Sequence, residues 1–357
     1  MINSMYDIAV IGMGPAGATL ARLLRPGVSV IALDRKRGSP EGGFQKPCGG
    51  LLAPDAQKAL ARFGLTLPLR VMVDPQIFSV RTIDAPAGLV RHYQRLYLNL
   101  DRHAFDHWLL SLLPSRVELH RGASCVSLER IPGGFRFSWR EGAAEHHAAA
   151  RYVVGADGAA SFVRRSLCPA FRMRRYTAIQ QWYADTHPTP FYSCIFDPGV
   201  TDCYAWGLSK NGRFIFGGAF EPHGARERFE TLKRRMRSFG FQLDAPVKTE
   251  ACAVLRPENP FDMHCGTDGC FLLGEAAGFI SPSSLEGLSY AFDSARILSR
   301  ILNARARRPN REYFAATLGL RAKLTGKLFK CPPIFHPRLR RLIMRSGLGS
   351  IALEDGP

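Results

Sequence analysis

Residues 6–34 read YDIAVIGMGPAGATLARLLRPGVSVIALD, and this stretch decides the fold class. Tyr6–Ile11 is short, apolar and rich in β-forming residues, as a buried parallel strand is. A glycine-rich turn follows, then helix-forming residues from Ala18 to Leu24, which Pro26-Gly27 end. Val28–Leu33 has the composition of a second buried strand. The stretch predicts a complete strand–helix–strand unit, which is typical of a doubly wound α/β domain.

The turn in this unit carries three glycines with a spacing that suits phosphate binding. Gly12 permits the tight turn, Gly14 lets the backbone approach a pyrophosphate, and Gly17 allows the helix to pack closely on the sheet. The helix then presents its N-terminal N–H groups to the phosphates. Asp34 ends the second strand, where its carboxylate can accept hydrogen bonds from an adenosine ribose. These residues predict dinucleotide binding; the alternative is a glycine turn in an unrelated α/β domain.

The composition is that of a globular protein and excludes several other classes of protein. The chain has 357 residues, of which 46% are hydrophobic and 22% charged, so disorder is excluded as the main state. No apolar run is long enough for a membrane-spanning helix, and the N-terminus lacks the features of a secretion signal. The nine cysteines form no CxxC pair, so we expect a reduced, cytoplasmic chain and no metal site.

The net charge of +18 is concentrated near the C-terminus. Between Arg296 and Arg345 there are 14 Lys and Arg residues and one acid, Glu312. Such a segment can contact an anionic lipid surface, so we expect peripheral contact with the inner membrane surface. An anionic substrate and a plain solvated basic face are the alternatives. No nucleic-acid-binding motif accompanies the basic residues, so nucleic acid is not an expected partner.

Five further segments have a clear expected structure. Asp101–Leu113 and Gly287–Asn303 have helical spacing, and Tyr152–Gly155 is expected to be a short strand. Ala178–Phe220 is dense in aromatic and β-branched residues and predicts a second sheet. The tail from Arg311 is expected to be helical, with a break at Cys331-Pro332-Pro333.

Two later motifs resemble those of the flavoprotein hydroxylase superfamily. Tyr152–Arg164 (YVVGADGAASFVR) resembles its DG fingerprint, and Leu272–Gly278 (LLGEAAG) resembles its GD motif, with Glu275 where Asp is usual. Arg102 matches the arginine that this superfamily places beside FAD. The resemblance implies that FAD is the cofactor and that the acid of the GD motif contacts its ribityl or ribose part.

Within this superfamily, the chain resembles the geranylgeranyl reductase family and, more narrowly, the bacterial CbrA-type flavoproteins. The loop Lys46-Pro47-Cys48-Gly49-Gly50 and the stretch Gly274–Gly287 carry the family resemblance, and Lys46–Gln57 (KPCGGLLAPDAQ) carries the narrower one. The family's substrate motif is kept only in part, as Tyr204 and Trp206. The resemblance implies a Rossmann-like FAD-binding domain with an inserted antiparallel β-sheet substrate domain, as in p-hydroxybenzoate hydroxylase, and a helical C-terminal tail.

On this basis we expect three parts. The FAD-binding domain is discontinuous and comprises residues 1–70, 100–170 and 263–310. Residues 71–99 and 171–262 form the β-rich substrate domain, and residues 311–357 form the basic helical segment.

The resemblance also implies an activity. We expect an FAD-dependent oxidoreductase that reduces carbon–carbon double bonds of a lipophilic, isoprenoid-like substrate by hydride transfer from the reduced flavin N5. Since no second dinucleotide loop is visible, NAD(P)H would bind transiently or a ferredoxin-like carrier would donate the electrons. The alternatives are a monooxygenase that hydroxylates through a C4a-hydroperoxide and a non-catalytic flavin-binding protein.

Cys48 is the candidate catalytic residue, because a thiol beside the flavin can protonate the carbon that does not receive hydride. The alternative is a small apolar residue in a glycine turn. Tyr204 and Trp206, two residues apart, are expected to share one strand face and to form the substrate wall. The expected cofactor-binding residues are Gly12, Gly14, Pro15, Ala16, Gly17, Asp34, Arg35, Lys46, Cys48, Gly49, Gly50, Arg102, Asp157, Gly158, Gly274, Glu275, Ala277, Gly278, Phe279 and Gly287.

Overall fold

A computed structural model describes residues 5–37, 46–185 and 189–354 of the chain. The chain divides into two compact units. The first unit comprises Met1–Gln45, Phe105–Arg174 and Leu255–Gly326, and the second comprises Lys46–Ala104, Arg175–Val254 and Lys327–Pro357.

A parallel sheet extended by an antiparallel meander forms the centre of the first unit. Its strand order is β6 (Val117–Arg121), β2 (Val30–Asp34), β1 (Met5–Ile11), β9 (Ala144–Gly155), β8 (Gly134–Glu141) and β7 (Ala123–Ile131), with β15 (Cys270–Leu272) also paired to β9. The pairs among β6, β2, β1, β9 and β15 are parallel, and the pairs among β7, β8 and β9 are antiparallel.

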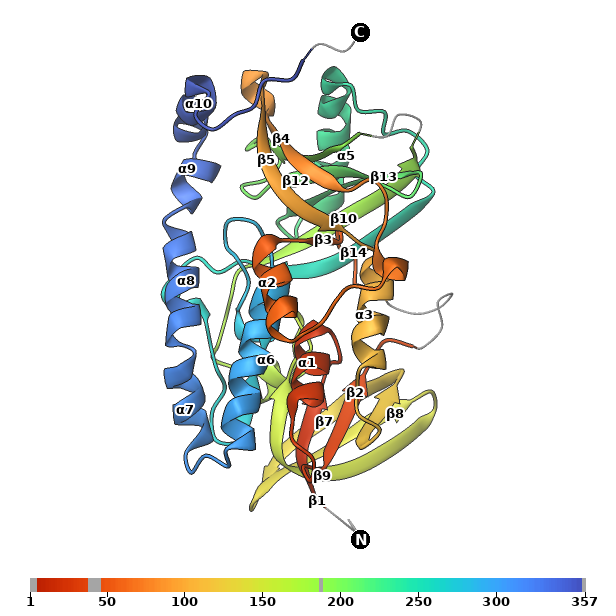
Figure 1. The fold of residues 1–357 in the computed structure, drawn as a ribbon, viewed down its shortest axis with the longest axis vertical. Coiled ribbons are helices and arrows are strands. Elements are labelled where there is room, and N and C mark those ends of the chain that lie inside the picture. The colour runs from red at the N-terminus through yellow and green to blue at the C-terminus, as the bar shows by residue number, and fades with distance from the viewer. Residues whose placement is uncertain (1–4, 38–45, 186–188, 355–357) are drawn as a thin grey trace. The chain divides into compact units, whose positions relative to one another are not determined.

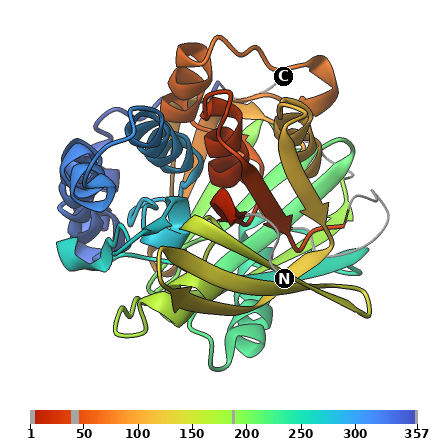
Figure 2. The same cartoon turned by 90° about the horizontal axis from the view of Figure 1, so that it is seen from below.

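The predicted strand–helix–strand unit is confirmed. β1 and β2 pair in parallel and are joined through helix α1 (Pro15–Leu23), whose residues from Pro15 to Ala21 are all buried. α1 packs against the long helix α6 (Leu288–Asn303), which confirms the helix expected at this position. The two helices lie side by side in both Figure 1 and Figure 2.

The strand expected at Tyr152–Gly155 is longer than predicted. It is the end of the 12-residue strand β9, which begins at Ala144. The reason is that Ala148–Ala150 pair on one side with β8, while β1 is paired along the other side from Ala149 onward. Small alanines fit between two neighbouring strands although their intrinsic β-propensity is low.

The second unit is built on a larger mixed sheet. Its order is β14 (Lys248–Leu255), β10 (Arg175–Ala184), β13 (Arg213–Phe220), β12 (Ala205–Lys210), β11 (Phe191–Phe196), β4 (Ile77–Asp84), β5 (Leu89–Asn99) and β3 (Leu51–Leu52). One face packs on helix α5 (Ala225–Met236) through a buried core that includes Phe216, Phe220 and Phe229. The aromatic residues of Ala178–Phe220 therefore do form a second sheet, as predicted.

The other elements are mostly helical. The longer helices are α2 (Pro54–Arg62), α3 (Arg102–Ser111), α4 (Phe162–Leu167), α7 (Pro309–Ala316), α8 (Leu318–Leu328), α9 (Cys331–Phe335) and α10 (Pro337–Ser346). Single turns of 3-10 helix lie at Leu69–Val71, Ala85–Ala87, Arg237–Phe239, Pro260–Asp262 and Gly274–Ala277. The tail is broken just before the predicted position: Phe329 and Lys330 separate α8 from α9, while Cys331, Pro332 and Pro333 form the first turn of α9, where proline is tolerated. No helix in the described part of the chain is long and apolar enough to cross a bilayer.

Several segments group differently from the domain scheme derived from sequence. Residues 100–104 lie in the second unit, residues 171–174 and 255–262 lie in the first, and the tail is divided after Gly326. Residues 46–70, which that scheme placed with the FAD-binding pieces, belong to the second unit by their contacts. The reason is that β3 pairs with β5, and Leu100 N–H donates to Gly50 O at 2.9 Å. As a division into functional domains, the three-part scheme remains a prediction.

Candidate functional site

The glycine turn of the first unit lies where β1 and β9 end side by side. Gly12 has φ +96°, and its N–H donates to Leu33 O at 2.8 Å, which turns the chain at the end of β1. A Cβ at Gly12 would lie 2.6 Å from Ala156 O and from the Cα of Asp157. The turn therefore packs directly against the DG motif, and only glycine fits there.

The next two glycines have opposite surroundings. A Cβ on Gly17 would overlap Gly12 O and lie 3.2 Å from the Val10 side chain, so Gly17 is required for packing α1 on β1. A Cβ on Gly14, by contrast, would have no atom within 4 Å. Gly14 precedes the first turn of α1, so this open space borders the N–H groups at the start of the helix. A pyrophosphate can approach at this position.

Asp34 has an unmet hydrogen-bonding capacity. The residue is only 4% exposed; Oδ1 accepts from Lys36 N–H at 3.2 Å, while the buried Oδ2 has no partner. Burial raises the pKa of the Asp34 carboxyl, and the charge of Lys36 only partly opposes this. Lys36 Nζ pairs with Asp106 Oδ2 at 2.7 Å. An acceptor without a donor at the end of β2 suits a ribose hydroxyl.

The DG motif has a structural role that the sequence did not reveal. Asp157 Oδ2 accepts from the N–H groups of Phe162 at 2.6 Å and Val163 at 3.2 Å, so the carboxylate caps the start of α4. Its other oxygen, Oδ1, is buried and has no partner. Burial raises the pKa of the Asp157 carboxyl, although the hydrogen bonds that it accepts act in the opposite direction.

Arg164, in the first turns of α4, connects the DG and GD motifs. Its guanidinium donates to Ala159 O at 2.5 Å and to Ala276 O at 2.8 Å, and the residue is 7% exposed. We did not select Arg164 from the sequence, where it is one of many arginines. Its position, seven residues after Asp157, was the available signal.

The GD motif completes the same site. A Cβ on Gly274 would lie 3.4 Å from Ala16 Cβ, and one on Gly158 would lie 3.9 Å from Glu275 Oε2. Glu275 Oε1 accepts from Leu255 N–H at 3.0 Å, which holds the carboxylate in place. The glycine turn, the DG motif and the GD motif therefore meet within the first unit.

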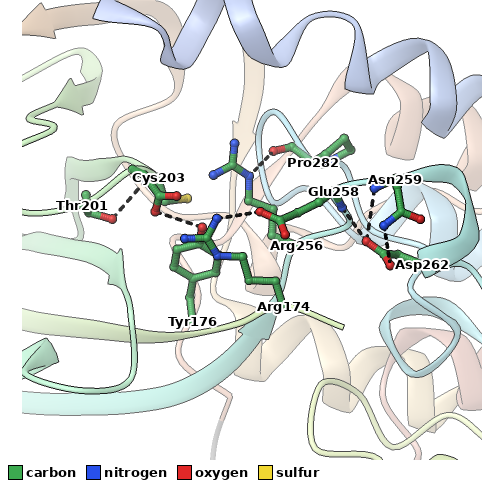
Figure 3. A network of polar contacts seen from close by, with 10 residues as sticks. Arg174, Tyr176, Thr201, Cys203, Arg256, Glu258, Asn259, Asp262 and Pro282 are labelled. Carbon is green, nitrogen blue, oxygen red and sulfur yellow. Dashed lines mark hydrogen bonds and ion pairs between the residues drawn. The ribbon is translucent and has the colours of Figure 1, made fainter. Parts of the chain in front are cut away.

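Polar contacts fix the chain on both sides of the GD motif, as Figure 3 shows. Arg256 Nε donates to Pro282 O at 3.1 Å, Arg174 pairs with Glu258 at 2.6 Å, and Asn259 and Asp262 form a reciprocal cap. These contacts hold the segment before the GD motif and join it, through Pro282, to the chain just after the motif.

The remaining predicted residues of the first unit lie at helix starts or strand ends. Gly287 precedes the first turn of α6, and Phe279 is fully buried. Gly278 and Ala277 end the 3-10 turn, Pro15 begins α1, and Arg35 is exposed after β2. Taken together, the open space at Gly14, the unmet acceptor of Asp34 and the free start of α1 fit a dinucleotide such as FAD.

In the second unit, the cysteine loop crosses one face of the sheet. Cys252 Sγ on β14 lies 3.9 Å from Pro47 O, and a Cβ on Gly49 would lie 3.7 Å from Leu208 on β12. Cys48 is partly exposed, and its Sγ accepts from Gly50 N–H at 3.4 Å. The loop therefore presents a thiol above the sheet.

Positive charges surround this thiol. Burial opposes its ionisation, but the charges of Arg102 and Lys210 outweigh that effect and hold the pKa of Cys48 below its usual value. Lys46 adds to the effect. A lowered pKa makes the thiol more reactive at neutral pH.

Lys210 is the main residue that the sequence analysis missed. It is 4% exposed, and its Nζ donates to Gly49 O and to Leu100 O, both at 2.7 Å. Burial lowers the pKa of Lys210 to about 8, although Cys48 and Asp101 act in the opposite direction. Gly50 has φ +69°, and a Cβ there would collide with the backbone oxygen of Leu100 and with Lys210 Nζ, which explains this glycine. In sequence, Lys210 resembles any lysine at the end of a strand.

Tyr204 and Trp206 lie on the same side of the sheet as this loop. Their rings pack edge to face with centroids 5.9 Å apart. Residues alternate along β12, so Trp206, Leu208 and Lys210 share one face, the face that the cysteine loop covers. A Cβ on Gly217 would lie 2.7 Å from the Trp206 ring, and Trp206 Nε1 donates to Gln180 Oε1 at 3.3 Å. Gly217 and Gln180 were not predicted.

The predicted site residues thus fall into two groups. The glycine turn, Asp34, Arg35, the DG motif and the residues from Gly274 to Gly287 belong to the first unit. The second group, in the second unit, comprises Lys46, Cys48, Gly49, Gly50, Arg102, Tyr204 and Trp206. Each group is assembled within its own unit.

Comparison with known proteins gives matches over the whole chain. The protein CbrA of Escherichia coli O9:H4 (strain HS) is 52% identical over 353 residues, which cover 99% of this chain and 96% of that protein. The CbrA protein of Shigella flexneri serotype 5b is also 52% identical over 353 residues, with the same coverage. No protein-family model matches the chain.

Solved structures confirm the predicted fold class. A geranylgeranyl bacteriochlorophyll reductase-like protein from Thermoplasma acidophilum superimposes with a TM-score of 0.70 at 16% identity, covering 98% of this chain and 89% of that one. PqsL, a probable FAD-dependent monooxygenase from Pseudomonas aeruginosa, gives a TM-score of 0.70 at 18% identity, covering 96% and 100%. The fold is therefore the mixed α/β fold of FAD-dependent reductases and hydroxylases, with a second, antiparallel-rich sheet and C-terminal helices.

Proposed function

Because this chain belongs to the CbrA family and has the fold of FAD-dependent oxidoreductases, we propose that it binds FAD and reduces carbon–carbon double bonds of a lipophilic, isoprenoid-like substrate. The observation that carries the proposal is the meeting of the three motifs in the first unit. It leaves open space at Gly14 and an unmet acceptor at Asp34, the two features that a dinucleotide needs.

The first unit has the groups to hold the cofactor. The N–H groups at the start of α1 would bind the pyrophosphate, and the Asp34 carboxylate would accept from the ribose. Glu275, fixed by Leu255 N–H, would face the ribityl chain. When bound and reduced, FAD supplies a hydride from its N5. The electrons come from an external donor, NAD(P)H or a ferredoxin-like carrier.

Cys48 is the proposed proton donor to the second alkene carbon. Its lowered pKa and partial exposure suit a thiol that exchanges protons with a substrate. Lys210, whose pKa of about 8 lies near neutrality, holds the loop through Gly49 O and ties it to Leu100 O, and its positive charge favours the Cys48 thiolate that remains after proton transfer. As pH rises through 8 the Lys210 ammonium is lost, so protonation of substrate should slow above that pH.

The same sheet face supports the proposed substrate class. Beside the cysteine loop it presents the rings of Tyr204 and Trp206 and the apolar side chain of Leu208. Tyr192 and Tyr204 interact, and burial raises the pKa of both hydroxyls well above the usual value, so both stay neutral. A wall of neutral aromatic groups suits an apolar chain better than a charged metabolite.

A reduction assay without oxygen tests this function. Protein reduced chemically under anaerobic conditions is mixed with an allylic isoprenoid alcohol or its diphosphate, and the saturated product is measured by mass spectrometry. We expect saturation of the alkene and reoxidation of the flavin together. If the product forms only with oxygen and carries a new hydroxyl group, the protein is a monooxygenase and the reductase proposal is wrong.

Two cysteine variants test the role of Cys48. Cys48→Ser should lower turnover by about 100-fold or more, as for loss of a general acid, with the flavin content unchanged. Cys252→Ser is the matched control, since Cys252 Sγ lies beside the same loop but is not the proposed donor. Equal turnover in the two variants would refute the proton-donor role.

A further inference from the structure

Helix α10 is fixed to the second unit through one of its sides. Arg340 is 4% exposed, and its Nε donates to Asp84 Oδ2 at 3.0 Å, while Asp84 is fully buried. The Arg340 guanidinium also lies over the Phe196 ring at 4.7 Å. Arg91 on β5 donates to Met344 O at 2.9 Å. The side of the helix that carries Arg340 and Met344 therefore faces the sheet.

The outward side of α10 is apolar along one stripe. Leu339, Leu342 and Ile343 are 43%, 68% and 42% exposed, and their i, i+3 and i+4 spacing places them together on a helix. The chain after the helix continues this surface with Leu348, Ile351 and Leu353, which are 78%, 42% and 49% exposed. Ile351 N–H donates to His92 O at 2.8 Å, so this segment is held along β5.

A basic stripe lies next to the apolar one. Arg338, Arg341 and Arg345 recur at i, i+3 and i+7, and Arg338 and Arg345 are exposed. From Lys327 to Leu353 there are six Lys and Arg residues and no acid, and β5 adds Arg91 and Arg95 without an acid. Exposed leucines and arginines therefore lie side by side on α10, on the sides of the helix that do not carry Arg340 and Met344. Helix α10 is the dark blue helix labelled in Figure 1.

We propose that this α10 surface, comprising the exposed side chains of Pro337–Leu353, binds the surface of a bilayer that contains anionic lipids. Leucine and isoleucine would enter the headgroup region, and the neighbouring arginines would pair with lipid phosphates. A second copy of this chain fits poorly, because a two-fold contact would bring two basic surfaces together. Nucleic acid would match the arginines, but it offers no partner for the outward leucines.

The test is flotation of the full-length, flavin-loaded protein with lipid vesicles. We expect binding to vesicles of phosphatidylcholine mixed with phosphatidylglycerol, much weaker binding to phosphatidylcholine alone, and weakening by salt. Leu342→Glu, and separately the pair Arg338→Glu and Arg345→Glu, should each reduce partitioning by about tenfold or more. Two independent variants are used so that the apolar and the basic contributions are measured separately.

Matched controls exist elsewhere on the chain. Phe261 is 88% exposed, so Phe261→Glu places a charge on another exposed apolar residue. Arg226→Glu with Arg234→Glu makes the same charge change on two exposed residues of α5. Both controls should bind vesicles like the unchanged protein, and circular dichroism and flavin content should be equal in all variants.

Three results would overturn the proposal. The first is equal binding to neutral and anionic vesicles. The second is loss of binding in the control variants to the same extent as in the α10 variants. The third is that the protein binds no vesicles but binds DNA or RNA in a salt-sensitive way, and that the α10 variants abolish this binding. The last would assign the surface to nucleic acid. None of these readouts depends on turnover, so the outcome is separate from that of the reductase proposal.

Discussion

The two units build their candidate sites in different ways. In the first unit the site consists mainly of backbone: a turn in which Gly12 and Gly17 admit no Cβ while Gly14 borders open space, a helix start, and the Asp34 carboxylate with its unmet oxygen. In the second unit it consists of side chains from different strands, Trp206 on β12 and Gln180 on β10, below a loop that carries Cys48. A backbone site depends on a few short motifs, whereas a side-chain site depends on strand register.

This difference predicts different responses to mutation. In the first unit, a side chain added where no protein atom lies should affect the ligand and leave the protein stable. In the second unit, the same groups support both the loop and the thiol, so chemistry and stability should change together. The four predictions below test this distinction, from the largest expected effect to the smallest.

The largest effect is expected for Gly14→Val. The new side chain points into open space, so the fold should be unaffected while the pyrophosphate is blocked. FAD affinity should fall by about 100-fold, or about 2.7 kcal/mol, with little change in melting temperature. Titration of the apoprotein followed by flavin fluorescence measures the first quantity, and calorimetry the second.

Gly319→Val is the control for this change. A Cβ on Gly319, in α8, also has no atom within 4 Å, but the residue lies outside the glycine turn. It should keep full FAD affinity. If Gly14→Val also kept it, the pyrophosphate would not bind at this turn.

Arg164→Met should destabilise the first unit. The change leaves the carbonyls of Ala159 and Ala276 without their buried donor, which costs about 2 kcal/mol of unfolding free energy. The neighbouring Arg165 is exposed, so Arg165→Met should change stability very little. Urea denaturation of the two variants compares them, and equal midpoints would mean that Arg164 does not connect the motifs.

A smaller, pH-dependent effect is expected at Asp34. Burial raises the pKa of this carboxyl in the free protein, and a ribose donor would lower it again, because it stabilises the charged form. FAD affinity should therefore fall as pH decreases through the raised pKa. Asp34→Asn should bind FAD about tenfold more weakly at neutral pH, about 1.4 kcal/mol, and lose this pH dependence. If the Asp34→Asn variant kept the pH dependence of FAD affinity, another titratable group would be its cause.

The smallest effect is expected for Lys210→Met. Loss of the ammonium should raise the pKa of Cys48 and slow its alkylation by iodoacetamide about threefold at neutral pH. The variant should also be less stable, because Gly49 O and Leu100 O lose their donor. Lys248→Met, at a 52% exposed lysine on β14, is the control, and alkylation equal in both variants would show that Lys210 does not lower the pKa of Cys48.

The sequence predicted the backbone site more completely than the side-chain site. The phosphate turn was visible because Gly12, Gly14 and Gly17 must stand at fixed spacing within one strand–helix turn. Asp106 was missed because an aspartate that binds a lysine elsewhere in the fold has no local pattern. Arg164 lies within the DG fingerprint, but its contact with Ala276 O depends on how the DG and GD motifs pack together.

In the second unit, the sequence identified the residues but not their neighbours. Cys48 and Trp206 were singled out, yet Lys210 and Gln180 were not, since their contacts depend on how β12, β13 and β10 align. The Trp206 ring lies where a side chain at position 217 would be, because Gly217 has none. The sequence of β12 alone does not reveal this contact. Register is a property of pairs of strands.

The most direct test of the central claim is the flavin content of the purified chain. The protein, isolated without added cofactor and then denatured, is analysed by chromatography against FAD, FMN and riboflavin standards. The account predicts FAD, in a ratio close to one per chain, and its loss in Gly14→Val. A colourless protein that takes up no added FAD, or one that releases only FMN, would contradict it.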